Sequence, residues 1–240
     1  QTYRGAHEPV QFPAGLLERL EGIGRAEGAT LYMVLLAAFQ VMLGKYAGTD
    51  DVVVGSPIAG RTRAETEALI GFFVNTLALR TDLSGDPSFP ELLGPVREGS
   101  VGAFEHHDLP FERLVEEIAP ERSLAHTPVF QVMFALQNKE MGALALGEPR
   151  MEPLAGLDEV SQFALGFSLQ EHEGRIGGTL HYRTDLFEEA TAARLLEHFR
   201  ALLEAVAADP DRRLSEVSVL APPERERVVG EWGRARDLPS

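Results

Sequence analysis

Hydrophobic positions near the N-terminus follow the period of an α-helix. The first such segment is closed by Gly28 and repeats apolar side chains at intervals of three and four residues: Leu16, Leu17, Leu20 and Ile23. A second helix is predicted between Thr30, as its N-cap, and Gly48, as its end. Because apolar side chains occupy nearly every face of this second helix, we expect it to be buried.

Runs rich in β-branched and apolar residues predict strands over residues 51–56, 72–80, 129–137, 162–171 and 175–183. The first strand is expected to lead into a loop at residues 57–62, and the last two to pair through Glu173 and Gly174. Alternation in the third strand predicts that its apolar side chains share one face: Phe130, Val132, Phe134 and Leu136.

Two helices are predicted in the middle of the chain from their terminal residues. Ser88 and Glu91 have the spacing of a capping box, and the helix they begin is expected to run to about His106. A short amphipathic helix follows, with Asp108 as its predicted N-cap and Pro120 as its stop.

The C-terminal part of the chain contains one long amphipathic helix that is expected to end at Asp209 and Pro210; its apolar face is Leu195, Leu196, Phe199, Leu202, Leu203 and Val206. Residues 139–159 are rich in Gly and Pro and predict a long loop with one short strand. From Ala221 the chain reads as a linker with a short charged helix that contains Trp232. Because helices and strands intermix throughout, the expected fold class is α/β.

Composition narrows the range of partners. The 240 residues include 22 Lys plus Arg and 37 Asp plus Glu, a formal net charge of -15, which disfavours nucleic acid and anionic membranes. The chain has no cysteine, no cationic leader, and no apolar run of the roughly 20 residues that span a bilayer. We therefore expect a cytoplasmic protein with no membrane or nucleic acid partner. The start at Gln1, without an initiator Met, leads us to expect a piece of a longer chain.

Side chains that could carry chemistry are sparse. His106, His107 and Asp108 are adjacent, whereas a helical metal pair requires a spacing of four residues, so we interpret them as a helix end with surface histidines. The glycines of residues 22–28 follow a helix and lack dinucleotide-loop spacing. Neither a Walker loop nor a GxSxG nucleophile elbow occurs. We predict no metal site and no catalytic residue in this chain.

Two features on the predicted strands leave their interpretation open. Asn75 is predicted to lie on the strand face that also carries Phe73, Leu77 and Leu79. Its amide there is either bonded to neighbouring backbone or available to a ligand. In the strand at 162–171, Ala164, Gly166 and Ser168 point away from the large apolar residues. A face of such small side chains admits close approach by an internal helix, a second lobe or a slender substrate arm.

Three segments in order resemble the last three core motifs of condensation domains from nonribosomal peptide synthetases: IGFFVNTLALRTDLSGDPSFPELL (70–93), HHDLPFERLVEEI (106–118) and RSLAHTPVFQVMFALQN (122–138). The flanking segments DDVVVGSPIAGR and LHYRTDLFEEATAARLLEHFRALLEAV agree with the same family. The resemblance covers nearly the whole chain. It identifies residues 1–220 as the C-terminal lobe and residues 221–240 as the start of a linker toward an adenylation domain.

The resemblance implies one lobe of a fold similar to chloramphenicol acetyltransferase, with a mixed sheet packed with helices. In that family two lobes form a V, and donor and acceptor carrier proteins deliver phosphopantetheine arms into the tunnel between them. The donor thioester is attacked there by the acceptor amine to give an amide. The implied partners are the N-terminal lobe, the two carrier proteins and the downstream adenylation domain. Phosphopantetheine arrives on the carrier proteins, and no cofactor is expected to bind this chain directly.

The catalytic motif of the family, HHxxxDG, has no copy in this sequence. His106 and His107 begin similarly, but Phe111 and Glu112 stand where Asp and Gly are required. The isolated chain is therefore expected to be inactive. The motif segments look like the class that accepts a D-configured donor, or the related dual class. Ala164 departs from the family, because many relatives carry Asp at that position.

The resemblance also implies positions along the substrate channel. Gly55 and Ser56 are expected near the tunnel floor, with Asn75 nearby, and Ser161 and Gln162 at the crossover to the other lobe. A binding module that recruits a carrier or tailoring protein is the alternative function. A stand-alone small-molecule acetyltransferase would require a catalytic histidine that the sequence does not offer.

Overall fold

The computed structural model describes residues 3–60, 65, 69–71, 73–118, 127–137, 160–172 and 174–232. The strands are β1 (Gly5–Gln11), β2 (Asp51–Ala59), β3 (Val74–Asp82), β4 (Val132–Gln137), β5 (Leu165–His172) and β6 (Arg175–Arg183). The helices are α1 (Leu16–Ala26), α2 (Leu31–Ala47), α4 (Phe89–Glu105), α5 (Phe111–Ile118), α6 (Glu189–Ala208) and α7 (Pro222–Arg227), with a π-helical segment η1 (Val228–Trp232).

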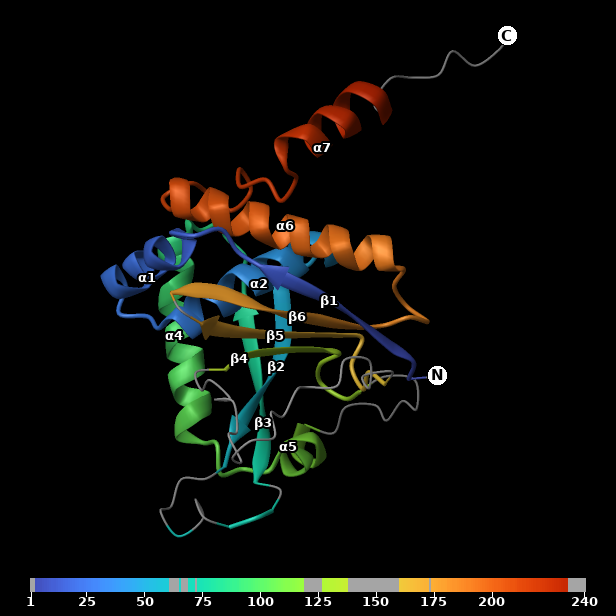
Figure 1. Ribbon diagram of the computed structural model, residues 1–240. Coiled ribbons are helices and arrows are strands. Elements are labelled where there is room, and N and C mark those ends of the chain that lie inside the picture. The colour runs from blue at the N-terminus through green and yellow to red at the C-terminus, as the bar shows by residue number, and fades with distance from the viewer. Residues whose placement is uncertain are drawn as a thin grey trace, which may run out of the picture.

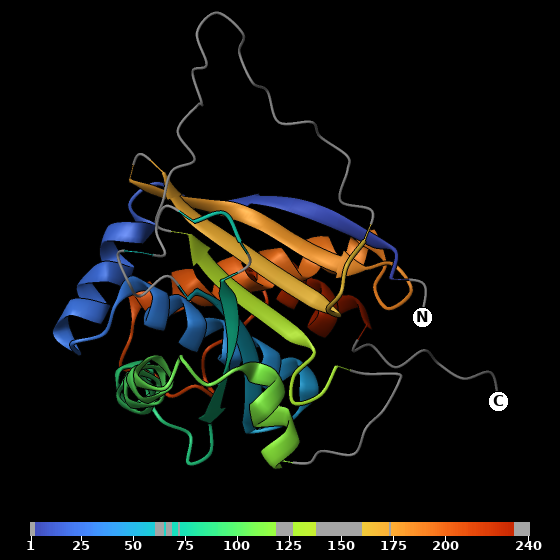
Figure 2. The same ribbon diagram turned by 90° about the horizontal axis from the view of Figure 1, so that it is seen from below.

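Within the described residues, the strands form one mixed sheet of six in the order β1-β6-β5-β4-β2-β3. The β2–β4 and β4–β5 pairs are parallel, and the other neighbours are antiparallel. Helices α1, α2, α4 and α6 pack together on one side of the sheet, and α2 and α6 lie over the strands (Figures 1 and 2). The predicted α/β class, with a mixed sheet packed with helices, is confirmed.

The core lies between the sheet and this layer of helices. Helix α2 is buried along most of its length, as its nearly uniform apolar sequence predicted. Phe39 of α2 contacts Phe134 of β4, Phe167 of β5 and Phe199 of α6, with ring centroids 5.4, 5.6 and 5.9 Å away. Aromatic packing of this kind adds to the free energy from burial, so these four rings join the central strands to the helices.

The polar side chain of Gln40 lies inside this core without exposure to solvent. Its Nε2 donates to the carbonyl oxygen of Leu79 at 3.1 Å, and its Oε1 accepts from the Thr81 hydroxyl at 2.8 Å. Burial of an amide is tolerated when its hydrogen bonds are made. The residue that interrupts the apolar run of α2 therefore anchors that helix to β3.

Helix ends agree with the local sequence signals. The Thr30 hydroxyl accepts from the Met33 N–H, and Gly48 ends α2 in the left-handed conformation at φ 64°. Ser88 and Glu91 form the predicted capping box of α4, in which the Ser88 N–H donates to Glu91 Oε2 at 2.7 Å. His106 is the C-cap of α4, as predicted.

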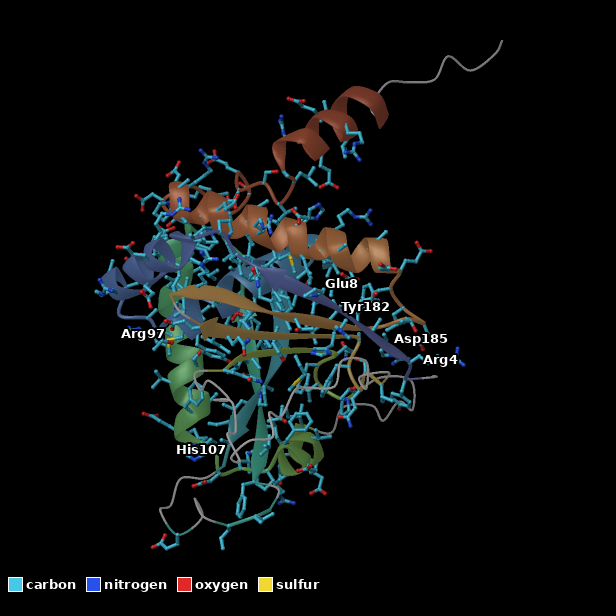
Figure 3. All side chains as sticks on the ribbon, in the orientation of Figure 1. Arg4, Glu8, Arg97, His107, Tyr182 and Asp185 are labelled. Carbon is cyan, nitrogen blue, oxygen red and sulfur yellow. The ribbon has the colours of Figure 1, made fainter. Side chains whose placement is uncertain are left out.

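The sequence patterns did not predict strand β1. Its inward positions include the charged Glu8, so the apolar alternation that marks a strand is weak. Pro9 lies within it, which is compatible with β1 because, among the residues that the structure describes, this strand is at the sheet edge and pairs with β6. The side chains of Arg4, Tyr182 and Asp185 lie toward the same end of the β1–β6 pair (Figure 3).

Several strand boundaries differ from the prediction, and two of these differences bear on the residues of the site. β2 continues past Ser56 to Ala59, because its antiparallel pairing with β3 extends to Val74. β4 begins at Val132, since Val129 has a positive φ of 71° and turns the chain before the strand. The prediction that Phe130 shares a face with Phe134 was therefore wrong: Phe130 lies over Gly55, on the other side of the sheet.

The predicted N-cap of α5 was also wrong. The helix begins at Phe111, and the Phe111 N–H donates to Oδ1 of Asn75 in β3 at 3.1 Å. Asn75 thus takes the place assigned to Asp108, from 36 residues earlier in the chain. The predicted loop and short strand at residues 139–159 lie outside the described residues.

The end of the chain departs from the globular body. The predicted charged helix in the tail corresponds to α7 followed by η1, which ends at Trp232. Figure 1 shows α7 beyond α6, pointing away from the sheet. The π-helical turn of η1 was not anticipated from the sequence.

Candidate functional site

The five residues predicted to line a substrate channel come from two places in the sheet. Gly55 and Ser56 are neighbours in β2, and Asn75 lies in the adjacent strand β3. Ser161 and Gln162 lie just before β5, which β4 separates from β2. The fold therefore brings the first three residues onto neighbouring strands and places the other two across β4.

The sheet face opposite α1, α2, α4 and α6, which we call the open face, carries small side chains at several positions. The strand registers place one residue of each strand in a row across it: His7, His181, Gly166, Met133, Gly55 and Ala78. The next row includes Ala135, Ser168 and Thr179. The predicted orientation of Gly166 and Ser168, away from Phe167, is confirmed by these registers.

Gly55 allows an aromatic ring to lie directly on β2. A Cβ at this position would come within 2.2 Å of Phe130 Cε2 and 2.6 Å of Met133 Sδ. The Phe130 ring, 1% exposed, in turn stacks on Phe163 at 5.9 Å and contacts Phe111 at 5.2 Å between centroids. Gly55 thus holds its place beneath an aromatic cluster that joins α5, β4 and the segment before β5.

Ser56 points to the opposite side of β2 from Gly55, as alternation along a strand requires. The Tyr32 hydroxyl of α2 donates to Ser56 Oγ at 2.7 Å. Burial raises the pKa of Tyr32 to about 12, and the hydrogen bond to Ser56 partly opposes that shift. Tyr32 therefore stays protonated at neutral pH, and Ser56 links β2 to the helix layer.

The Asn75 amide joins β3 to the connection between α4 and α5. Its Nδ2 donates to the carbonyl oxygens of His107 and Leu109, each at 2.7 Å. Its Oδ1 accepts from the N–H groups of Thr76 at 2.8 Å and Phe111 at 3.1 Å. The amide is thus bonded to backbone at both of its ends, which is the first of the two interpretations that the sequence left open.

Ser161 is held in the approach to β5, whereas Gln162 is exposed. The Ser161 N–H donates to the carbonyl oxygen of Tyr3, and its hydroxyl donates to the carbonyl oxygen of Phe163, both at 2.9 Å. A Cβ on Gly5 would come within 2.9 Å of the Ser161 nitrogen, so this contact requires glycine. Ser161 thereby fixes the start of β5 against the chain just before β1.

The two adjacent histidines lie at the end of α4, where Figure 3 labels His107. His106 is exposed, and the Nδ1 of His107 is 2.6 Å from the carbonyl oxygen of Phe104. Nε2 of His107 lies 3.4 Å from a carboxylate oxygen of Asp108. The interpretation of this pair as a helix end agrees with the geometry, but only His106 is a surface histidine, because the His107 side chain is 21% exposed and its Nε2 is buried.

Sequence patterns did not identify Tyr32, Phe130 or Phe163 as parts of this region. Tyr32 carried a usable signal, since it places a hydroxyl near the start of a helix that is otherwise almost entirely apolar. Phe130 and Phe163 lie just outside the strands that follow them, so strand alternation could not predict where their rings point.

Comparison with known proteins identifies the family to which this chain belongs. The family model described as "Condensation domain" matches residues 1–229. This chain belongs to the condensation-domain family. A linear gramicidin synthase of Brevibacillus parabrevis is 46% identical over 234 residues, which are 97% of this chain and 3% of that protein. The isonitrile lipopeptide synthase of Mycobacterium tuberculosis is 44% identical over 236 residues, 96% of this chain and 9% of that protein.

Solved structures agree with this membership. The X-domain from teicoplanin biosynthesis is 33% identical with a TM-score of 0.84, covering 91% of this chain and 50% of that one. The condensation domain of the Monacolin K polyketide synthase MokA shares the fold at 20% identity and a TM-score of 0.80, covering 89% and 49%. The expected chloramphenicol acetyltransferase-like fold is confirmed by these neighbours. This condensation-domain chain spans about half the length of each.

Within the described residues, no single helix is long and apolar enough to cross a membrane; α1 and α2 reach that length and composition only as a pair bent by 99°.

Proposed function

We propose that this chain is the C-terminal half of a condensation domain that forms amide bonds between substrates held on carrier proteins. Residues 1–220 form the C-terminal lobe in this proposal, and residues 221–240 lead toward an adenylation domain. The observation that carries it is the open face of small side chains, in a chain half as long as the solved relatives. A sheet with its main layer of helices on one side supplies one wall of a channel, and the other half of the domain supplies the second wall.

The reaction joins a donor acyl or peptidyl thioester to the amine of an acceptor aminoacyl group. The amine nitrogen bonds to the thioester carbonyl carbon, the C–S bond breaks, and the sulfur leaves as a thiol with the proton that the amine loses. His107 bonds to the end of its own helix, and His106 lies on the surface. We therefore assign no catalytic residue to this chain and place the HHxxxDG motif in the other half.

The open face suits a phosphopantetheine arm, which is long and narrow and needs close access to the sheet. Gly55 and Ser56 shape β2 beneath this channel, because Phe130 covers Gly55 and Tyr32 holds Ser56. Asn75 fixes the neighbouring α4–α5 connection, and Ser161 and Gln162 begin the crossover. The arms belong to the carrier proteins, so this chain binds no cofactor of its own.

The proposed partners follow from this role as one half of a two-lobed domain that receives substrates from carrier proteins. They are the N-terminal lobe, the donor and acceptor carrier proteins, and the adenylation domain after the linker. Nucleic acid and membranes are excluded from the proposal, because a formal net charge of -15 repels phosphates and anionic lipids. Its location is the cytoplasm. The motif segments favour a donor that ends in a D-residue, or the dual class.

The decisive test reconstitutes the domain from its halves. This chain and the upstream half are purified separately and mixed with donor and acceptor carrier proteins loaded with D- or L-terminated substrates, and the amide is measured by mass spectrometry. We expect product only when both halves are present, and more from the D-terminated donor. Product from this chain alone at the rate of the joined halves would contradict the proposal, as would none from the folded, joined halves.

A docking module for a carrier or tailoring protein is the second candidate. It is favoured by one specific likeness: a structure described as the complex of the X-domain and OxyB from teicoplanin biosynthesis is 32% identical, with a TM-score of 0.81. The two candidates differ in the upstream half. An intact HHxxxDG motif there supports amide formation, and a degenerate motif with retained binding of a tailoring protein supports docking.

A further inference from the structure

His198 is a buried histidine outside the open face that connects three helices. It lies in α6, and its side chain is 6% exposed. Its Nδ1 is hydrogen-bonded to the hydroxyl of Tyr46 in α2, and its Nε2 lies 2.7 Å from Oε2 of Glu224 in α7. The Tyr46 and His198 rings are also in contact, with centroids 5.7 Å apart. Both ring nitrogens of His198 are therefore used, one toward the body and one toward the linker.

The partners determine the direction of these hydrogen bonds. An ionised carboxylate only accepts, so Nε2 of His198 donates to Glu224. In the neutral ring Nδ1 is then the acceptor, and it accepts from the Tyr46 hydroxyl. Burial raises the pKa of Tyr46, which keeps this hydroxyl protonated. The guanidinium of Arg194 in α6 opposes this rise in the pKa of Tyr46, so charged groups act on both sides of the Tyr46–His198 pair.

Glu224 differs from the charged residues that follow it in α7. Its side chain is 23% exposed, whereas Arg225, Glu226 and Arg227 are all on the surface. Figure 1 shows α7 reaching out beyond α6, so a contact at Glu224 sits where the linker leaves the body. A hydrogen bond between an ionised carboxylate and a buried imidazole is stronger than a neutral one. This one carboxylate is suited to fix the direction of the whole helix.

We propose that the α2–α6 surface around Tyr46 and His198 is a docking site for the linker helix α7, which it recognises through Glu224. Docking sets the direction in which the chain leaves the lobe, and hence where the next domain stands. That the next domain is an adenylation domain rests on the function proposed above. The docking contact itself concerns residues of this chain alone.

The test measures the position of α7 on the full chain, which has no cysteine of its own. Spin labels on Glu18→Cys in α1 and Arg227→Cys in α7 report the distance between body and linker helix by double electron–electron resonance. We expect one narrow distance distribution, and a clearly broader one after Glu224→Ala. The control Glu226→Ala, on the same helix but exposed, should leave it narrow. Tyr46→Phe should broaden it less than Glu224→Ala does, because only the supporting hydroxyl is lost.

The opposite results are equally clear. A broad distribution in the starting protein, or a narrow one after Glu224→Ala, would overturn the docking site. Circular dichroism of each variant checks that the lobe is folded, and Glu224 is a linker residue whose change leaves the core intact. Because no readout uses amide formation, failure of this proposal and failure of the catalytic proposal are observed separately.

Discussion

Gly55 has a specific steric role at the scale of the single residue. A Cβ at this position would overlap the Phe130 ring, which is fixed in turn by Phe111 and Phe163. We expect Gly55→Ala to lower the free energy of unfolding by about 1–3 kcal/mol, the usual cost of overpacking. Urea denaturation followed by circular dichroism measures this change.

The control is another glycine-to-alanine change where space is free. A Cβ on Gly102, inside α4, meets nothing within 4 Å, so Gly102→Ala should be neutral or stabilising by up to about 1 kcal/mol. The overlap with Phe130 also predicts coupling: Gly55→Ala should cost less in a Phe130→Ala background than alone. Equal costs in the two backgrounds would rule out this explanation.

A second prediction for a single residue concerns Asp86, whose carboxylate makes the stability of the folded protein depend on pH. The backbone N–H of Ser215 and then its hydroxyl hydrogen-bond this carboxylate, and Arg213 attracts it, so its pKa lies below the ordinary value. A carboxyl with a lowered folded-state pKa stabilises the protein fully above its unfolded pKa of about 3.9, and this contribution disappears as pH falls through the folded pKa.

We therefore expect Asp86→Asn to lower the melting temperature at pH 7, and the difference from the parent to shrink toward zero as pH falls below about 3.9. Asparagine is the suitable substitute, because Asp86 has a positive φ of 50° that asparagine tolerates. Thermal unfolding of both proteins between pH 3 and pH 7 makes the comparison. A difference that stays constant over this range would exclude the assigned role.

Asn75 acts at the scale of elements, because its one side chain joins β3 to α5. Asn75→Ala leaves the carbonyl oxygens of His107 and Leu109 and the N–H of Phe111 without this partner. We expect a loss of about 1–3 kcal/mol in unfolding free energy, with faster hydrogen exchange in α5. Mass spectrometry of peptides from α5 measures the exchange.

Two further variants separate the amide from its position. Asn75→Asp keeps the shape but replaces two N–H donors by an oxygen that faces two carbonyl oxygens, so it should be at least as harmful as alanine. Thr76→Val is the control, since the neighbouring residue contributes its backbone N–H to the contact and not its hydroxyl. Exchange in α5 that is unchanged in all three proteins would show that Asn75 does not hold this helix.

The open face defines a prediction for the whole molecule, provided that the other half of the domain covers it. Ser168 lies on the open face between Ala135 and Thr179 and is half-buried, so a larger side chain there projects toward the half that covers this face. Ser168→Arg should leave the melting temperature of this chain nearly unchanged but weaken its association with the upstream half at least tenfold. Ala193→Arg, which adds the same charge on the exposed side of α6, should leave both the melting temperature and the association unchanged. Calorimetry measures the association of the two halves. An equal effect of both variants on this association would contradict the assignment of the open face as the covered surface.

Several parts of this architecture were set by the sequence itself. The ends of α2 and α4 were predicted correctly because Thr30, Gly48, Ser88 and Glu91 act on backbone groups within about one helical turn. The burial of α2 and the pairing of β5 with β6 followed from apolar periodicity and a glycine turn. Family membership was likewise predictable, because motifs in a fixed order can be recognised from the residues alone, before their contacts are known.

Only the tertiary structure decided which distant groups meet. The left-handed turn at Val129 moved Phe130 to the other side of the sheet, and Asn75 displaced Asp108 as the partner of α5. His198 found Tyr46 on one side and Glu224 on the other, 152 and 26 residues away. Caps and periodicity are local, so a sequence displays them directly. A polar or aromatic side chain is satisfied by whatever the fold brings beside it, and that partner exists only once the helices and strands have packed.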